Sequence, residues 1–367
     1  MVHFAKFFLK RASVLSLLLL FTVQCSQDPD TPLVLDIEYE ETLLLGTDDS
    51  EAPDHKIFRS VTHVEVDDQG WMYVVNSGES SIRVFDDNGD FQSSFGSQGS
   101  GPGEFQAISS LFIDSHNRLL IVDSNQARIT AYSLDGNFLS TWQLPSITRV
   151  HQIAELSNSK FALVGQHNDK MIHITDDEFS TIEASFMPVQ DLLTSNEREE
   201  RVLLQFFPGS IAVLPDLSIA YAPALYGGEL FVYSATQKGN WNLTKTIEGQ
   251  SFHIQPASFT AFDQADRVDM PITFPEEGRY AAQFHSFSQG IFSIDDLLVH
   301  YSFQESNDGE LELRSEHFTM DGDRIGTAFI DKMERLSVSI LNLDDQANLY
   351  LSDSRDFPKL RRLKVID

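Results

Sequence analysis

The sequence predicts an all-β protein, a six-bladed β-propeller built of four-stranded antiparallel blades. The first observation is a repeat, because residues 66–77 recur 47 positions later as residues 113–124. The second is that both copies alternate apolar and polar residues in short runs, as half-buried strands do. The third is that Asn88-Gly89 and Asp135-Gly136 stand at the same place in both copies, and there we expect type I′ hairpin turns. A period in the forties with four strands per unit is typical of a propeller blade.

The N-terminal 25 residues differ from everything that follows. A basic segment containing Lys6, Lys10 and Arg11 precedes the apolar run 12–23, which is too short for a stable membrane-spanning helix and is typical of a signal peptide. Cys25 follows and is the only cysteine, so no intrachain disulfide can form. Its place resembles the lipobox of bacterial lipoproteins, in which this cysteine is acylated and becomes the mature N-terminus.

The lipobox resemblance implies a membrane partner, reached through acylated Cys25. Residues 26–32 are then a polar tether, similar to the acidic signal that sends some lipoproteins of the Bacteroidetes type to the cell surface. We therefore expect the bacterial cell envelope as the location, with a lipid anchor in the outer membrane. The alternative is an ordinary secretory signal followed by an unmodified cysteine, because Thr22 and Gln24 depart from the lipobox; that reading predicts a secreted protein.

The propeller is expected to occupy residues 33–367 as one domain. Blades one and two are predicted at about 60–95 and 108–142, and the glycine-rich stretch 96–105 is the connection between them. The later blades repeat the pattern less regularly, and we place them at about 151–179, 210–245, 290–326 and 336–367. Blade six is one strand short. We expect residues 33–46 to supply that strand and so close the ring without an open edge.

Two long insertions interrupt the repeat, at about 188–207 and 249–284. The first mixes apolar residues with glutamate and arginine, which predicts a short helix outside the sheets. The second contains Pro256, Pro271 and Pro275 and cannot form a regular blade.

A family resemblance is visible in the best-preserved units. Residues 101–105, Gly-Pro-Gly-Glu-Phe, followed by the runs 111–114, 120–129 and 135–138, resemble an NHL-type propeller repeat. The whole chain is similar to six-bladed propeller lipoproteins of Bacteroidetes-like bacteria. The resemblance implies the fold but little about function, since one propeller fold hosts many unrelated activities.

Charge limits the choice of partners. The chain has 26 basic and 55 acidic residues, which gives a net charge of −29 at pH 7. Such a surface repels nucleic acid, so no nucleic-acid partner is expected. The charge predicts a solvated acidic coat, and multi-site cation binding is the alternative.

The sequence contains none of the common catalytic motifs. There is no metalloprotease helix motif, paired-cysteine zinc site, Walker loop or Gly-x-Ser-x-Gly elbow. Asp123 and Asp353 end second strands and are expected to cap the turns after them. We expect His167 and His173 to face solvent. Aromatic residues that recur at the repeat spacing are expected in the core between blades: Phe85, Phe95, Tyr132 and Trp142.

The function is predicted from the insertions. Connections between successive blades gather on one face of a propeller, so both insertions should lie on that face, over blades three to five. Long structured loops in a compact domain are usually functional. We therefore predict a non-enzymatic binding propeller, without a required cofactor, that recognises a peptide, glycan or partner protein on the insertion-bearing face. Cationic and aromatic residues are the expected contacts: Arg128, Arg149, His151, Tyr226, His253, Arg279, His285 and Arg355.

The alternative is a metal-dependent hydrolase or lactonase of the gluconolactonase-like propeller class. It requires a divalent cation in the central channel, held by carboxylates and amides from several inner strands. The inner strands and their ends offer these candidates: Glu65, Asp67, Asp114, Glu155, Asp216, Asp295, Asn342 and Asp344. Convergence of three of them on one point would favour the enzyme.

Overall fold

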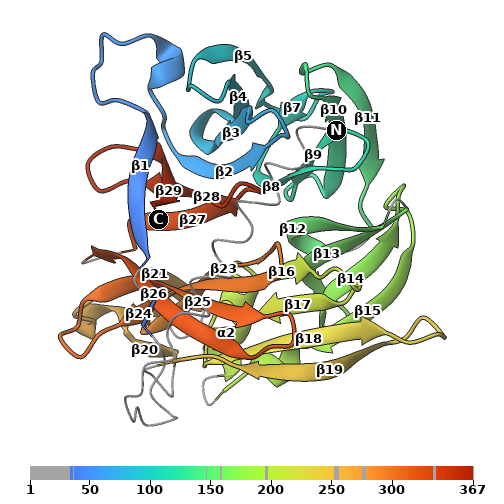
Figure 1. Ribbon diagram of the computed structural model, residues 1–367, viewed down its shortest axis with the longest axis vertical. Coiled ribbons are helices and arrows are strands. Elements are labelled where there is room, and N and C mark those ends of the chain that lie inside the picture. The colour runs from blue at the N-terminus through green and yellow to red at the C-terminus, as the bar shows by residue number, and fades with distance from the viewer. Residues whose placement is uncertain are drawn as a thin grey trace, which may run out of the picture. The chain divides into compact units, whose positions relative to one another are not determined.

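Six four-stranded antiparallel sheets form the blades of the protein (Figure 1). The computed structural model describes residues 34–366, except 36, 146, 158, 195–196, 252–255, 275–277 and 334–335. The predicted signal peptide, the tether, Cys25 and His253 lie outside the described residues. Within the described ranges no helix has the length and apolar character needed to cross a membrane.

Blades one to five each use four consecutive strands, because each repeat holds four apolar–polar runs separated by turn residues. Blade one comprises β2 (Val61–Val66), β3 (Met72–Asn76), β4 (Ser81–Phe85) and β5 (Phe91–Phe95). Blade two comprises β8 (Ile108–Ile113), β9 (Arg118–Asp123), β10 (Arg128–Ser133) and β11 (Phe138–Gln143). Blade three comprises β12 (Thr148–Ser157), β13 (Lys160–His167), β14 (Lys170–Asp176) and β15 (Ile182–Pro188).

Blades four and five follow the same order. Blade four comprises β16 (Ser210–Val213), β17 (Ile219–Ala222), β18 (Glu229–Ala235) and β19 (Trp241–Glu248). Blade five comprises β23 (Ser286–Ile294), β24 (Leu297–Glu305), β25 (Leu311–Thr319) and β26 (Arg324–Met333). Strand β23 begins at Ser286 rather than at the expected residue 290. The reason is a register shift at Gly290, beyond which β23 pairs with β24 as far as Ser286↔Gln304.

Blade six combines strands from distant parts of the chain. Its order is β1-β29-β28-β27, where β1 is Glu38–Leu45, β27 Val338–Leu343, β28 Asn348–Asp353 and β29 Lys359–Ile366. Strand β1 runs antiparallel to β29 from Glu38↔Ile366 to Leu45↔Leu360, and Figure 1 shows the blue strand beside the red one. Residues from the segment expected at 33–46 therefore form the outer strand of this sheet. The innermost strand of the same sheet, β27, contacts β2 of blade one.

The hairpin turns differ from the expected type. Only the glycines have positive φ, 83° at Gly89 and 82° at Gly136. The Gly89 amide donates to the Asp86 carbonyl and the Asp86 amide donates to the Asp90 carbonyl. The type I′ prediction is therefore wrong, because that turn needs positive φ at both central residues. In each loop the residue before the glycine has negative φ and only the glycine is left-handed. The adjoining strands show a register shift.

Aromatic side chains fill the space between neighbouring blades. The ring of Phe95 in blade one stacks on Tyr132 in blade two at 4.9 Å between centroids. The Trp142 ring meets Phe179 of blade three edge-on at 5.5 Å. The core positions predicted from the repeat spacing are confirmed by these contacts.

The glycine-rich connection between blades one and two contains two short parallel strands, β6 (Ser97–Gln98) and β7 (Glu104–Phe105). Phe105 is fully buried, so the connection is anchored in the core.

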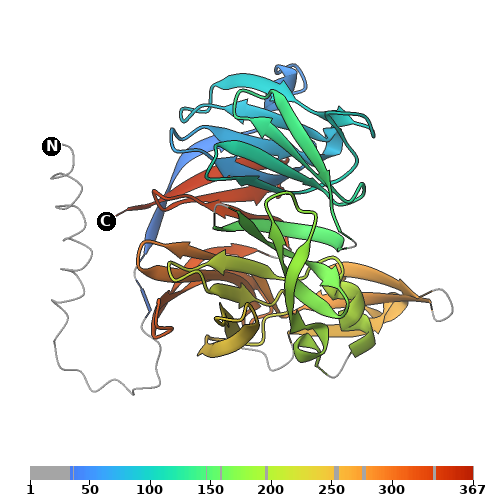
Figure 2. The same ribbon diagram turned by 90° about the vertical axis from the view of Figure 1, so that its right-hand side faces the viewer.

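Both insertions connect the outer strand of one blade to the inner strand of the next. The first holds a 3-10 turn, η3 (Val189–Leu192), and the predicted short helix, α2 (Glu197–Leu204). The second forms a separate three-stranded sheet in the order β20-β22-β21, with β20 (Ala257–Ala261), β21 (Met270–Phe274) and β22 (Gly278–Phe284). Figure 2 shows α2 and this sheet projecting from the same side of the blades.

Candidate ligand-binding face

The two insertions form one continuous surface. A buried apolar cluster joins Leu203 of α2 to Ile272 and Phe284 of the extra sheet and to Leu225 and Phe287 of blades four and five. We call α2, residues 205–207 and β20 to β22 the insertion surface. The expectation that both insertions share one face over blades three to five agrees with this packing, because a shared core fixes their relative position.

At one end of the insertion surface, Arg149 contacts the end of the first insertion. Its guanidinium lies 4.3 Å from the centre of the Phe206 ring, and Phe206 is 38% exposed. Arg149 has a φ of 49° beside a register shift in β12. A left-handed arginine is uncommon, and residues held in this region concentrate at functional sites.

His151 lies next to this pair. Its Nε2 donates to the Gln205 carbonyl at 3.1 Å, which ties β12 to the end of the first insertion. Burial lowers the pKa of His151 below its ordinary value, and the Arg149 cation acts in the same direction. His151 is therefore a neutral side chain at pH 7, and Arg149 carries the positive charge beside the end of the first insertion.

A second arginine on the insertion surface has the same arrangement. The Arg279 guanidinium stacks on the Phe262 ring at 4.0 Å. Several arginines elsewhere bind carboxylates, as Arg118 binds Asp114 and Arg361 binds Glu41. Among the described residues neither Arg149 nor Arg279 has a carboxylate partner. A stacked guanidinium keeps its N–H edge free, and that edge matches a carboxylate.

Tyr226 and His285 belong to internal networks instead. Tyr226 is fully buried, and its hydroxyl donates to Glu316 at 2.6 Å, so it does not face a ligand. His285 is partly exposed and contacts Glu305 and Ser258. Burial raises the pKa of Tyr226 well above its usual value, with the Glu316 charge adding to the effect.

Arg128 and Arg355 hold parts of the fold together. Arg128 donates to the carbonyls of Gly101 and Glu104 and so fixes the glycine-rich connection. Arg355 binds Asp353 at 2.6 Å and Asp331 at 3.1 Å. Both arginines are therefore structural links, and the structure does not bring them together with Arg149 or Arg279.

Two ionisable side chains, His63 and Glu65, project from the innermost strand of blade one. Burial lowers the pKa of His63 to about 4 and raises the pKa of Glu65 to about 8. The Asn342 amide, on the innermost strand of blade six, lies 3.5 Å from the Glu65 carboxyl. Glu65 is therefore mostly protonated at pH 7, which makes it a poor ligand for a divalent cation.

The other acidic candidates for a metal site mainly stabilise turns. Asp67, Asp114 and Asp344 occupy equivalent positions, and each accepts two backbone N–H bonds from the turn that follows it. In the described ranges no group of three or more His, Cys, Asp or Glu side chains is arranged to hold a metal.

Asp123 and His173 are both fully buried. Asp123 accepts the backbone N–H groups of Gln126, Gln106 and Ala107, so it caps its turn and also anchors the connection into β8. The expectation that His173 faces solvent is wrong. Its ring is fully buried between the Gly165 carbonyl and the Ser185 hydroxyl.

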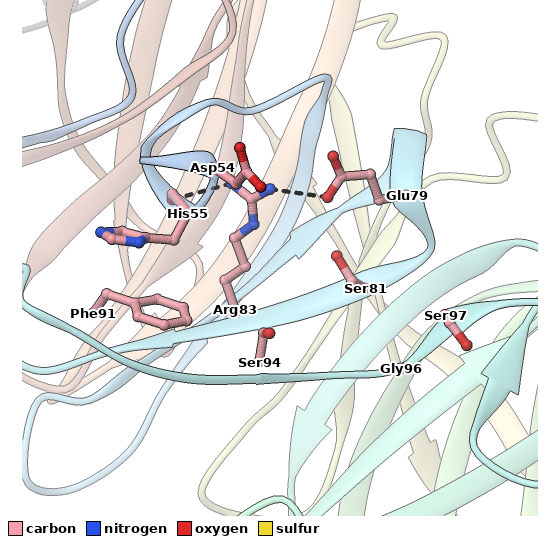
Figure 3. Close-up of a pocket in the computed structure, with 9 residues that line it drawn as sticks. All are labelled: Asp54, His55, Glu79, Ser81, Arg83, Phe91, Ser94, Gly96 and Ser97. Carbon is pink, nitrogen blue, oxygen red and sulfur yellow. Dashed lines mark hydrogen bonds and ion pairs between the residues drawn. The ribbon is translucent and has the colours of Figure 1, made fainter. Parts of the chain in front are cut away.

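Two hollows in the surface are lined by residues at blade one and at the junction of blades one and six. Figure 3 shows one of about 450 Å³ on blade one, where the His55 ring stacks on Phe91 at 4.4 Å. Arg83 crosses its floor, and it donates to the His55 carbonyl at 3.0 Å and to Glu79 at 2.9 Å. A second hollow of about 320 Å³ is lined by hydroxyl groups of blades one and six, Ser60 and Ser339 among them.

Several features of the site were not predicted from the sequence. Phe206 and Phe262 were not selected, because an aromatic residue in an insertion has no repeat position to compare with. Ser258, Glu305 and Glu316 were missed because their partners are distant in sequence.

Comparison with known proteins supports the fold. Residues 38–218 match the sequence profile of a family described as DUF5128, a 6-bladed beta-propeller. No curated protein matches the chain.

Two solved structures of Bacteroides proteins have a similar fold. A member of the DUF4221 family from Bacteroides vulgatus is 10% identical, with a TM-score of 0.56 over 90% of this chain and 99% of its own. A Bacteroides fragilis protein whose name describes it as exported is 14% identical, with a TM-score of 0.51 over 93% of this chain and 98% of its own. At these identities the likeness concerns the fold alone. Together with the six four-stranded sheets, these matches identify the protein as a six-bladed β-propeller.

Proposed function

We propose that this protein is an envelope-anchored binding propeller that recognises a ligand on its insertion surface. One observation carries the proposal: Arg149 and Arg279 stack on Phe206 and Phe262 and have no carboxylate partner among the described residues. An arginine on an aromatic ring combines apolar contact with a directed donor edge, a combination frequent at binding hot spots.

The chemistry of these pairs favours a ligand with a carboxylate group. The ligand is a peptide, glycan or partner protein that places a carboxylate against one guanidinium and an apolar group against the ring. The net charge of −29 repels a dense polyanion, so isolated carboxylates fit better than a polyacidic chain.

An extracytoplasmic location is consistent with the predicted signal peptide and with the exported Bacteroides fragilis protein that shares the fold. Acylation of Cys25 is the proposed means of attachment. The NHL-type resemblance of blades one and two supports the same class of propeller but does not name a ligand.

The test is a binding screen against acidic and neutral peptides and against glycans with and without uronic acids. Arg149→Ala with Arg279→Ala should lower affinity for every ligand found by about 10-fold or more, since charge-assisted hydrogen bonds are worth about 1.5–3 kcal/mol each. The matched control is Arg324→Ala, which removes an exposed arginine at the start of β26, outside the insertion surface. Ligands that bind the double variant and the wild type equally would refute the proposed site.

A further inference from the structure

Three side chains beside the extra sheet are arranged as a nucleophile, a base and a carboxylate. The Ser258 hydroxyl lies 2.9 Å from His285 Nε2, and His285 Nδ1 lies 2.5 Å from Glu305 Oε2. In serine hydrolases the same atoms of the imidazole face the same groups, Nε2 toward the hydroxyl and Nδ1 toward the carboxylate. These two contacts meet the geometric requirement for an activated serine.

The backbone holds the three residues in place. Ser258 is the second residue of β20 and is paired with Gln283 of β22. The His285 amide donates to the Pro256 carbonyl at 2.8 Å, and the Glu305 amide donates to the His285 carbonyl at 2.7 Å. Catalytic groups require such fixed supports, because their effect depends on a maintained geometry.

Arg267 holds the carboxylate from the other side. Its Nη2 lies 3.4 Å from Glu305 Oε2, its Nε lies 3.1 Å from Asp269, and its Nη2 also donates to the Phe284 carbonyl at 2.7 Å. Glu305 is therefore oriented by a guanidinium that is itself fixed.

A second serine–histidine–glutamate series in blade five provides an internal comparison. Ser288 lies 3.0 Å from His300 Nε2, and His300 Nδ1 lies 3.1 Å from Glu316. This series is closed to substrates, because the side chains of His300 and Glu316 are 0% and 1% exposed. The side chains of His285 and Glu305 are instead 25% and 19% exposed, and Ser258 is partly exposed. Of these two series, the one at the extra sheet is therefore within reach of a substrate.

We propose that Ser258 and His285 are the catalytic residues of an ester hydrolase, with Glu305 as the residue that positions His285. The Ser258 oxygen attacks the ester carbonyl carbon while His285 Nε2 takes the hydroxyl proton. The C–O bond to the alcohol breaks, and the alcohol leaves with that proton. Water then attacks the acyl-serine, gives a proton to His285, and the acid is released as Ser258 regains its proton. The sum is ester plus water giving acid plus alcohol.

The test uses a fluorophosphonate probe, which forms a covalent bond with activated serines and expels fluoride. We expect the full-length protein in detergent to be labelled, and peptide mapping by mass spectrometry to place the adduct on Ser258. Ser258→Ala should abolish labelling, and His285→Gln should slow it by about 100-fold or more. Glu305→Gln should also slow it, and Glu305→Asp should restore part of the rate, which a purely structural role would not predict.

Mapping on the wild type keeps the test independent of how well the variants fold. A wild-type protein without an adduct on Ser258 would overturn the proposal, and so would labelling that His285→Gln leaves unchanged. The Ser288 peptide serves as the buried control and should stay unmodified. Hydrolysis of p-nitrophenyl acetate should follow the labelling across the variants. Lys238→Ala, in the exposed β18–β19 turn, should alter neither readout. The labelling test needs no ligand of the insertion surface, so this proposal and the binding function can fail separately.

Discussion

The Tyr226 hydroxyl donates to Glu316 Oε2 at 2.6 Å, although the two residues are 90 positions apart in the chain. Tyr226 follows the second strand of blade four, and Glu316 lies on the third strand of blade five. The other Glu316 oxygen accepts the backbone N–H of Gln250, where the second insertion begins. A single buried carboxylate therefore joins two blades to the base of the insertion surface.

We expect Tyr226→Phe to destabilise the protein. The substitution removes one hydrogen bond to a buried carboxylate at little cost in shape, so the free energy of unfolding should fall by about 1.5–3 kcal/mol. Urea unfolding followed by tryptophan fluorescence measures the change. Tyr280→Phe is the control, because the Tyr280 ring contacts Phe274 and lies nearer the surface. Equal effects of the two substitutions would count against the role given to Glu316.

Glu65 should make stability depend on pH. Burial raises its pKa from 4.5 to about 8, so the folded state binds this proton more tightly than the unfolded chain. The resulting stabilisation is complete below about pH 4.5, declines as the pH rises and is gone above about pH 8. In Glu65→Gln the free energy of unfolding should fall less between these two pH values, by up to roughly 4 kcal/mol. Urea midpoints from pH 4 to pH 9 test this, with the exposed Glu51→Gln as control; parallel profiles for Glu65→Gln and wild type would contradict it.

Removal of residues 33–46 tests whether the first strand closes the ring. Without β1 the backbone edge of β29 is open, and exposed edges promote aggregation. We expect an insoluble product or one that unfolds without cooperativity, measured by sedimentation and thermal denaturation. Removal of the exposed loop residues 48–51 is the control and should leave a soluble, cooperative protein. Equal solubility and melting of the 33–46 deletion and the wild type would disprove closure.

Cys25→Ala should release the protein from membranes. Acyl chains supply anchoring energy of about 0.8 kcal/mol per buried CH₂, and the alanine variant has no site for them. Cell fractionation and metabolic labelling with a fatty acid measure both effects, with Ser26→Ala as the control. A wild-type protein that takes up no label would show that Cys25 is not acylated and favour the secreted alternative.

The fold could be predicted from the sequence because each repeat shows the periodic pattern of apolar residues that is typical of short strands. Residues such as Phe95 and Tyr132 recur at equivalent positions and pack between blades, so local pattern and tertiary contact agree. The extra sheet could not be predicted, since β20 pairs with β22 rather than with β21, the next strand along the chain. The turn type was missed because Asn-Gly and Asp-Gly suit more than one loop geometry.

The candidate site was predicted only in part. Arg149 and Arg279 could be selected as cations in an acidic protein, but the same criterion also selected Arg128 and Arg355, which bind the protein itself. Sequence cannot separate these cases, because the difference lies in which side chain the fold places opposite each guanidinium. The same limit applies to Ser258 and Glu305, which are far from His285 in sequence and reach it through strand pairing.

The pairing of β1 with β29 also makes a circular permutant of the protein possible, because it brings the two ends of the propeller together. Because Glu38 lies opposite Ile366, a short linker can join these positions without spanning the molecule. New ends could then be opened at the exposed β18–β19 turn, residues 236–240. In such a circular permutant β1 follows β29 directly, so blade six becomes four consecutive strands and blade four is instead completed by β19 from the new N-terminus. The strand pair that joins the two ends of the chain would then move from blade six to blade four.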